Sequence, residues 1–210
     1  PVFASEAEVR RPFPWRIMGM SVWGVGVVWL LSRLLLGTWW LRRKIRAEVR
    51  QTGLEGTRSE WRDLNEAVEG AAAEMGVRRR FCVVETELVS SRAFFGIWRP
   101  QLLVARGFAE KLNAQELRYV LLHEFAHLKR WDLATNWLMT VAQAVYWFNP
   151  LVWVALRQMR MKGELACDEM VLRASRSGAE EGRAYGETIL RLLEGVKPRR
   201  SLPALVGIAE

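Results

Sequence analysis

The pattern of apolar and charged positions begins with an apolar run long enough to cross a membrane. Residues 17–41 are 25 positions with one charge, Arg33, and as a helix they extend about 37 Å, enough for a tilted bilayer span. Trp15 precedes the run, and Trp39 and Trp40 end it, as interfacial aromatic residues do. We therefore predict a transmembrane helix over this run. The alternative, a buried helix of a soluble core, fits its length and aromatic ends less well.

The charges on either side of this run predict its orientation. Five cations follow it within nine positions: Arg42, Arg43, Lys44, Arg46 and Arg50. Because cationic flanks remain on the cytoplasmic side, we expect residues 1–16 to be an extracytoplasmic juxtamembrane segment and residues 42–195 to form a cytoplasmic domain. Residues 196–210, which contain two prolines, are expected to be a linker toward a further C-terminal part.

The pattern after the span predicts two helices, a small sheet and a capped helix. Residues 44–75 carry spaced apolar positions interrupted by two glycines, which indicates helix, turn and helix. Short β-prone runs follow at residues 81–84, 90–98 and 101–104. Asn113 and Glu116 then have capping-box spacing, so a helix is expected to begin near Ala114. This order of elements favours a mainly helical α+β domain.

Both histidines of the chain lie on this capped helix, in the motif His123-Glu124-Phe125-Ala126-His127. Spacing of i and i+4 places the two imidazoles on one helical face, where they can share a metal ion. Glu124 projects beside them, in the position of a general base acting on an activated water. The alternative, a polar stripe without function on an amphipathic helix, does not explain why both histidines of the chain lie on this one helix. The motif predicts one zinc ion per chain.

A catalytic zinc needs a third protein ligand, and no histidine remains to supply it. Glu164, Cys167 and Asp168 share a helical face at i, i+3 and i+4. We predict that Glu164 is the ligand and that Asp168 accepts a bond from an imidazole N–H. Cys167 is either a rival ligand or a small buried apolar residue. Asp132 is either a second support of a histidine or a charge at the helix end.

A second uncharged run, residues 133–156, raises a conflict with this metal site. As a straight span it would hold His127 and Glu164 on opposite sides of a roughly 30 Å hydrocarbon layer, whereas zinc ligands lie about 2 Å from one ion. Asn149 and Pro150 resolve the conflict, because proline disfavours helix at the residue before it.

The segment is therefore predicted to be a membrane-associated helical hairpin over about residues 133–160. Its tip, residues 146–148, is expected to touch the bilayer or neighbouring membrane helices. The legs are unequal in sequence, since 22 residues separate His127 from Asn149 and 14 separate Pro150 from Glu164. We predict a bend near residues 129–132 to compensate.

Composition limits the other function classes. The net charge is +8, but the cations are scattered or flank apolar runs without a nucleic-acid motif, so we expect no nucleic-acid binding. Two cysteines 85 positions apart cannot form the disulfide framework of a small secreted protein, which favours a reducing compartment. The chain begins with Pro1, and we expect it to be a segment of a longer protein.

The run HEFAHLKRWD, followed by YWFNPLVW and GELACDE, resembles the zinc metallopeptidase domain of the beta-lactam-sensing receptors, the BlaR/MecR family. The resemblance covers about residues 80–195. It implies a zincin-like fold of the gluzincin type in a multi-spanning protein of the bacterial inner membrane. It also implies His123, His127 and Glu164 as zinc ligands and Glu124 as catalytic base. The family's peptidase acts on itself and on a repressor of resistance genes.

The expected function is therefore that of a membrane-bound zinc endopeptidase in signalling. Glu124 would take a proton from the attacking water and pass it to the leaving nitrogen. The oxyanion donor is left open among Tyr185, Arg173 and a backbone N–H. A peptide substrate is expected to add to a strand edge made of Ala93, Phe94, Phe95 and Gly96.

Two other functions remain open: a metal-binding signalling module without proteolysis, and a membrane quality-control zinc protease. The expected partners are a protein substrate, membrane lipids and further membrane helices, and a homodimer is possible.

Overall fold

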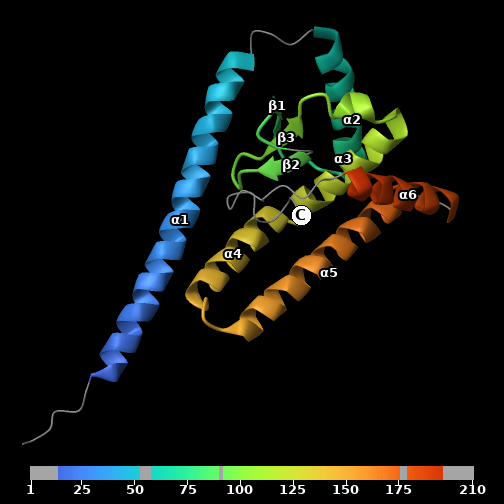
Figure 1. Cartoon of the computed structure of the whole chain (residues 1–210). Coiled ribbons are helices and arrows are strands. Elements are labelled where there is room, and N and C mark those ends of the chain that lie inside the picture. Colours follow the sequence, from blue (N-terminus) through green and yellow to red (C-terminus); the bar gives the residue numbers. More distant parts are fainter. Residues whose placement is uncertain (1–13, 53–57, 90–91, 176–178, 196–210) are drawn as a thin grey trace, which may run out of the picture.

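The computed structural model in Figure 1 describes residues 14–52, 58–89, 92–175 and 179–195. The predicted linker, residues 196–210, and nearly all of the predicted extracytoplasmic segment lie outside these ranges. The elements run in the order α1 (Trp15–Thr52), α2 (Arg58–Met75), β1 (Cys82–Thr86), β2 (Arg92–Phe95), β3 (Gln101–Ala105), a 3-10 turn η1 (Ala109–Lys111), α3 (Ala114–Lys129), α4 (Asp132–Val145), α5 (Pro150–Ala174) and α6 (Ala179–Gly195).

Helix α1 is longer than the predicted span. Its stretch Trp15–Glu48 is long and apolar enough to cross a membrane, and only 6% of its most apolar window is buried in the protein. The predicted boundary between residues 41 and 42 falls inside this one helix, and the separate helix expected from residue 44 is its continuation. No proline or glycine interrupts the chain between Thr38 and Thr52, so the helix does not end at the charge change.

The small sheet connects α1 to the rest of the domain. Its strand order is β1-β3-β2, with β1 parallel and β2 antiparallel to β3. Alternate side chains face opposite sides, so Phe94 and Leu102 join the core with α2 and α3, whereas Phe95 and Leu103 pack against Leu41 of α1. The result is a mainly helical fold with a mixed three-stranded sheet between α1 and the other helices (Figure 1).

Helix α3 begins and ends where the sequence predicts. Asn113 accepts a bond from the Glu116 amide, and the Glu116 carboxylate accepts one from the Asn113 amide, which confirms the capping box. The predicted bend is also present, because α3 ends at Lys129 and α4 begins at Asp132. Trp131 between them has a left-handed backbone with φ of 63°.

Helices α4 and α5 form the predicted hairpin, and its tip lies against α1 (Figure 1). The Trp23 indole donates a bond of 2.8 Å to the carbonyl of Val145, the last residue of α4. Gly26 lies directly against the Trp147 ring, so a Cβ there would come within 2.7 Å of the indole nitrogen. The tip therefore contacts a helix that is long and apolar enough to cross a membrane, nearer the start than the end of its apolar run.

Candidate metal centre

Helix α3 presents its two histidines to one carboxylate of α5. The imidazole rings of His123 and His127 have centroids 4.9 Å apart, as their spacing of one helical turn predicts. The Nε2 atoms lie 3.4 Å and 3.5 Å from the same oxygen, Oε2 of Glu164. The three ligand atoms are all within 4.8 Å of one another. The three predicted ligands are thus together in space, although 37 residues separate His127 from Glu164 (164 − 127 = 37).

The donor set and its surroundings fit a catalytic zinc ion. Two imidazole nitrogens and one carboxylate are the ligands of one common class of catalytic zinc site. The histidine side chains are 12% and 6% exposed, whereas that of Glu164 is 55% exposed, so the group is open to solvent on one side. Glu124, between the histidines, is buried, and its Oε2 has no hydrogen-bond partner among the described residues. A buried acceptor without a donor suits a water at this centre.

His127 is held from behind by α4 and α5. Its Nδ1 lies 2.8 Å from Oδ2 of Asp132 and 3.2 Å from the Cys167 sulfur. Asp132 therefore supports the imidazole, the first of the two roles considered for it. Cys167 is fully buried in the main core, and burial raises the pKa of its thiol. Its sulfur lies on the Nδ1 side of the ring, away from the Nε2 atom that faces Glu164.

His123 is held from behind by α5 and α6. Its Nδ1 lies 3.1 Å from Oδ1 of Asp168 and 3.0 Å from the Tyr185 hydroxyl. That hydroxyl donates a 2.6 Å bond to the same Asp168 oxygen. The role predicted for Asp168 matches this contact. Tyr185, considered above as an oxyanion donor, instead lies behind the imidazole, on the Nδ1 side.

The electrostatics of the group favour a bound cation. Burial alone lowers the pKa of His123, but hydrogen bonds with Asp168 and Glu164 outweigh it and raise the pKa. The pKa of His127 is likewise raised, because bonds with Asp132, Cys167 and Glu164 outweigh burial. Burial raises the pKa of Glu164, yet its bonds with both histidines lower it overall. The acidic groups thus hold positive charge on the imidazoles, and a metal ion can supply that charge in place of protons.

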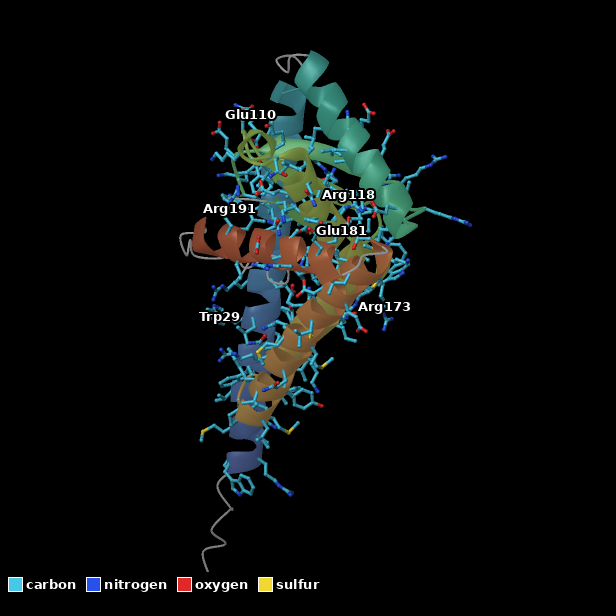
Figure 2. All side chains as sticks on the ribbon, turned by 90° about the vertical axis from the view of Figure 1, so that its right-hand side faces the viewer. Trp29, Glu110, Arg118, Arg173, Glu181 and Arg191 are labelled. Carbon is cyan, nitrogen blue, oxygen red and sulfur yellow. The ribbon has the colours of Figure 1, made fainter. Side chains whose placement is uncertain are left out.

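One contact of the centre was not predicted. Arg92, the first residue of β2, donates through Nε to Oε1 of Glu124 at 3.0 Å. A cation at the edge of the apolar run Ala93–Phe95 was the signal available in the sequence. By contrast, Arg173, the other oxyanion candidate, is paired with Glu169 on the outer side of α5 (Figure 2). Its side chain is 75% exposed.

The predicted substrate strand is at an edge of the sheet. β2 pairs with β3 on one side and is the last strand in the order β1-β3-β2. The side chains of Ala93, Phe94 and Phe95 are buried. Gly96 lies just beyond the strand, with φ of 93°, at a turn where a Cβ would come within 2.8 Å of the Arg99 carbonyl oxygen. Arg92, the first residue of the strand, contacts Glu124 of the histidine motif, so the strand lies beside that motif.

Comparisons with known proteins agree with these features. A sequence model of the family described as BlaR1 peptidase M56 matches residues 7–210. The regulatory protein BlaR1 of Bacillus licheniformis is 32% identical over 128 residues, which cover 61% of this chain and 21% of that protein. The methicillin resistance mecR1 protein of Staphylococcus aureus strain Mu50 is 29% identical over 129 residues, which cover 61% and 22%.

The chain thus spans about a fifth of the length of these two relatives. The resemblance to the BlaR/MecR family, stated above on its three motifs, is confirmed. Because the family match extends over nearly the whole sequence, the chain belongs to the BlaR1 peptidase M56 family.

Proposed function

We propose that the chain is the catalytic part of a membrane-bound zinc endopeptidase. The observation that carries the proposal is the meeting of His123, His127 and Glu164 around one point, with Glu124 buried beside them. Each histidine has its own carboxylate behind it, as in catalytic zinc sites, where such partners fix the tautomer and the ring orientation. The position of β2 beside this group supports a zincin-like arrangement of the gluzincin type, with an edge strand for the peptide.

The residues present divide the reaction between them. Zinc, when bound, supplies a Lewis acid that polarises a peptide carbonyl and makes a water more acidic. Glu124 accepts the proton of the attacking water and donates it to the leaving amide nitrogen. Asp132 and Asp168 accept the Nδ1 protons of the two histidines and leave both Nε2 atoms free as ligands. The edge of β2, at Ala93–Phe95, holds an extended peptide across the centre.

The arrangement of the helices supports a position at the membrane surface. The hairpin tip touches α1 at Gly26, which is 15 residues, or about 22 Å, from the end of the predicted span at Leu41. Glu164 lies 14 residues, or about 21 Å, back along α5 from Pro150. We propose that the metal centre lies near the end of the span that carries the cluster of cations. We propose that this is the cytoplasmic face of the bacterial inner membrane.

The names of the relatives suggest the biological setting. They are a regulatory protein and a methicillin resistance protein, and the chain covers only a fifth of each. We propose that the peptidase acts in signalling, with the chain itself or a transcriptional repressor as substrate. The rival, a metal-binding module without proteolysis, predicts the same zinc site and no cleavage.

The substitution Glu124→Gln separates these two functions. We expect the purified, detergent-solubilised chain to bind one zinc and to cleave fluorescein-labelled casein or itself. Glu124→Gln should keep the zinc and lose cleavage by about 10²–10⁴-fold, which is the usual contribution of a general base. Glu169→Gln, an exposed carboxylate on α5, is the matched control and should behave like the unchanged chain. Equal cleavage by the Glu124 variant would overturn the proposal.

A further inference from the structure

Among the described residues, the ion pair between Arg92 and Glu124 is less exposed than the other arginine ion pairs. The two side chains are 16% and 5% exposed, whereas those of the neighbouring pair Arg106–Glu87 are 53% and 71% exposed. The Arg92 guanidinium also lies over the Phe108 ring, 5.9 Å from its centroid. A buried, hydrogen-bonded pair has a fixed geometry, while exposed pairs contribute little.

Arg92 donates its hydrogen bond to only one of the two oxygens of the Glu124 carboxylate. Arg92 binds Oε1 of Glu124, and Oε2 of the same group is buried with no hydrogen-bond partner among the described residues. Within this part of the chain, Glu124 is also the only hydrogen-bond acceptor of Arg92. A carboxylate held at one oxygen keeps the other free for a water molecule. The free oxygen is the one that a general base uses.

We propose that Arg92 is a positioning residue, which fixes the Glu124 carboxylate from the edge strand so that Oε2 faces the attacking water. The inference rests on the proposed peptidase function and adds a residue to it. Arg92 precedes Ala93 on β2, so the strand expected to bind the peptide also carries the group that orients the base. Occupation of the strand edge and alignment of the base are thereby linked through one residue.

A competing role would use the same cation differently. Arg92 would then bind an acidic side chain of the substrate and determine specificity. A positioning residue acts on the chemical step, so its loss lowers kcat with little change in KM. A binding residue acts on the substrate, so its loss raises KM and leaves kcat nearly unchanged.

The test compares Arg92→Gln, Arg92→Lys and the control Arg106→Gln in the zinc-loaded, detergent-solubilised chain, with labelled casein as the probe. We expect Arg92→Gln to lower kcat by about 100-fold, the effect of a small misplacement of a catalytic group, with KM and zinc content unchanged. Arg92→Lys keeps the charge and should recover part of the loss. Arg106→Gln should match the unchanged chain. A rise in KM alone, unchanged kcat, or loss of zinc in both Arg92 variants would overturn the proposal.

A second readout does not depend on activity. The melting temperatures of Arg92→Gln, Glu124→Gln and the double variant form a cycle, and we expect the double variant to lose less than the sum of the two single losses. Additive losses would contradict the ion pair and with it the positioning role. Coupled losses in a zinc-loaded chain that cleaves nothing would instead overturn the proposed peptidase function and leave the pair as a structural contact.

Discussion

The metal-bearing helix α3 and the hairpin of α4 and α5 are both rich in apolar side chains, but they use them in opposite ways. In α3, Leu121, Leu122 and Phe125 are at most 2% exposed, and protein covers them on all sides. In the hairpin, Leu138 and Leu151 are 70% and 77% exposed. Exposed apolar surface of this extent needs a partner. The position proposed for the chain at the membrane would supply lipid as that partner.

The difference shows where the precision of the site originates. Around α3, each histidine of the centre has a carboxylate behind it, Asp132 behind His127 and Asp168 behind His123. On α1, by contrast, the side chain of Trp29 projects from the surface of the apolar span and is 60% exposed (Figure 2). The buried region thus fixes the geometry of the centre, and we propose that the apolar span of α1 fixes its position relative to the membrane.

The comparison predicts that the same change, leucine to alanine, costs much more stability in α3 than in the hairpin. Leu122→Ala removes a side chain that is 0% exposed and should lower the free energy of unfolding by about 2–5 kcal/mol. Leu138→Ala, at 70% exposure, should change it by less than about 0.5 kcal/mol. Thermal unfolding in one detergent measures both. Similar losses at the two positions would mean that the hairpin is packed in protein like α3.

The two carboxylates behind the histidines, Asp132 and Asp168, should contribute unequally to zinc affinity. Asp132→Asn weakens the bond to Nδ1 of His127 and should reduce zinc affinity by about 10–100-fold. Asp168→Asn should reduce it less, because this side chain is 36% exposed against 14% for Asp132, and Tyr185 remains against His123. Competition with a chromogenic chelator gives both affinities. A larger effect at Asp168 would contradict the account.

Two glycines of α1, Gly26 and Gly24, provide a sharp test of the contact between α1 and the hairpin. A Cβ at Gly26 would meet the Trp147 ring at 2.7 Å, so Gly26→Ala should cost about 1–3 kcal/mol through displacement of the indole. A Cβ at Gly24 would meet nothing within 4 Å, so Gly24→Ala should be neutral or stabilise the helix. Unfolding in lipid nanodiscs measures the pair. Equal effects would show that the tip does not rest on α1.

Metal removal should reverse the pH dependence of stability. In the metal-free chain the pKa values of His123 and His127 are raised above the ordinary value near 6.5. The stabilisation that these protonated imidazoles contribute is therefore fully present below about pH 6.5 and declines progressively as pH rises from there toward the raised pKa values. Zinc binds the neutral imidazoles and releases these protons, so the stabilisation by zinc should grow over the same range. Melting curves with and without chelator at pH 6–9 measure both trends, and parallel trends would contradict this linkage.

Local features of the sequence were sufficient for much of the site. The two histidines and Glu124 follow from helical spacing, and the start of α3 follows from Asn113 and Glu116. The hairpin follows from a conflict of distances, since Glu164 can meet His127 only if the chain turns at Pro150. These predictions depend on periodicity, capping and chain length, which are all properties of the sequence alone.

The remaining features depend on contacts between distant elements. Arg92 meets Glu124 only because β2 is placed against α3, and no pattern within either segment specifies that pairing. Tyr185 was one of three candidates for the oxyanion donor, yet α6 carries it behind His123. The length of α1 was underestimated because the change from apolar to charged residues was taken as an end, although the helix continues to Thr52.

The central claim is that His123, His127 and Glu164 hold one zinc ion, and elemental analysis of the detergent-purified chain tests it most directly. We expect one zinc per chain, loss of it in Glu164→Gln, and full retention in Glu169→Gln, the control on the same helix. Cys167→Ser should retain zinc, because its sulfur faces Nδ1 of His127 rather than the shared point. Loss of zinc in Cys167→Ser with retention in Glu164→Gln would contradict the ligand set and the catalytic centre built on it.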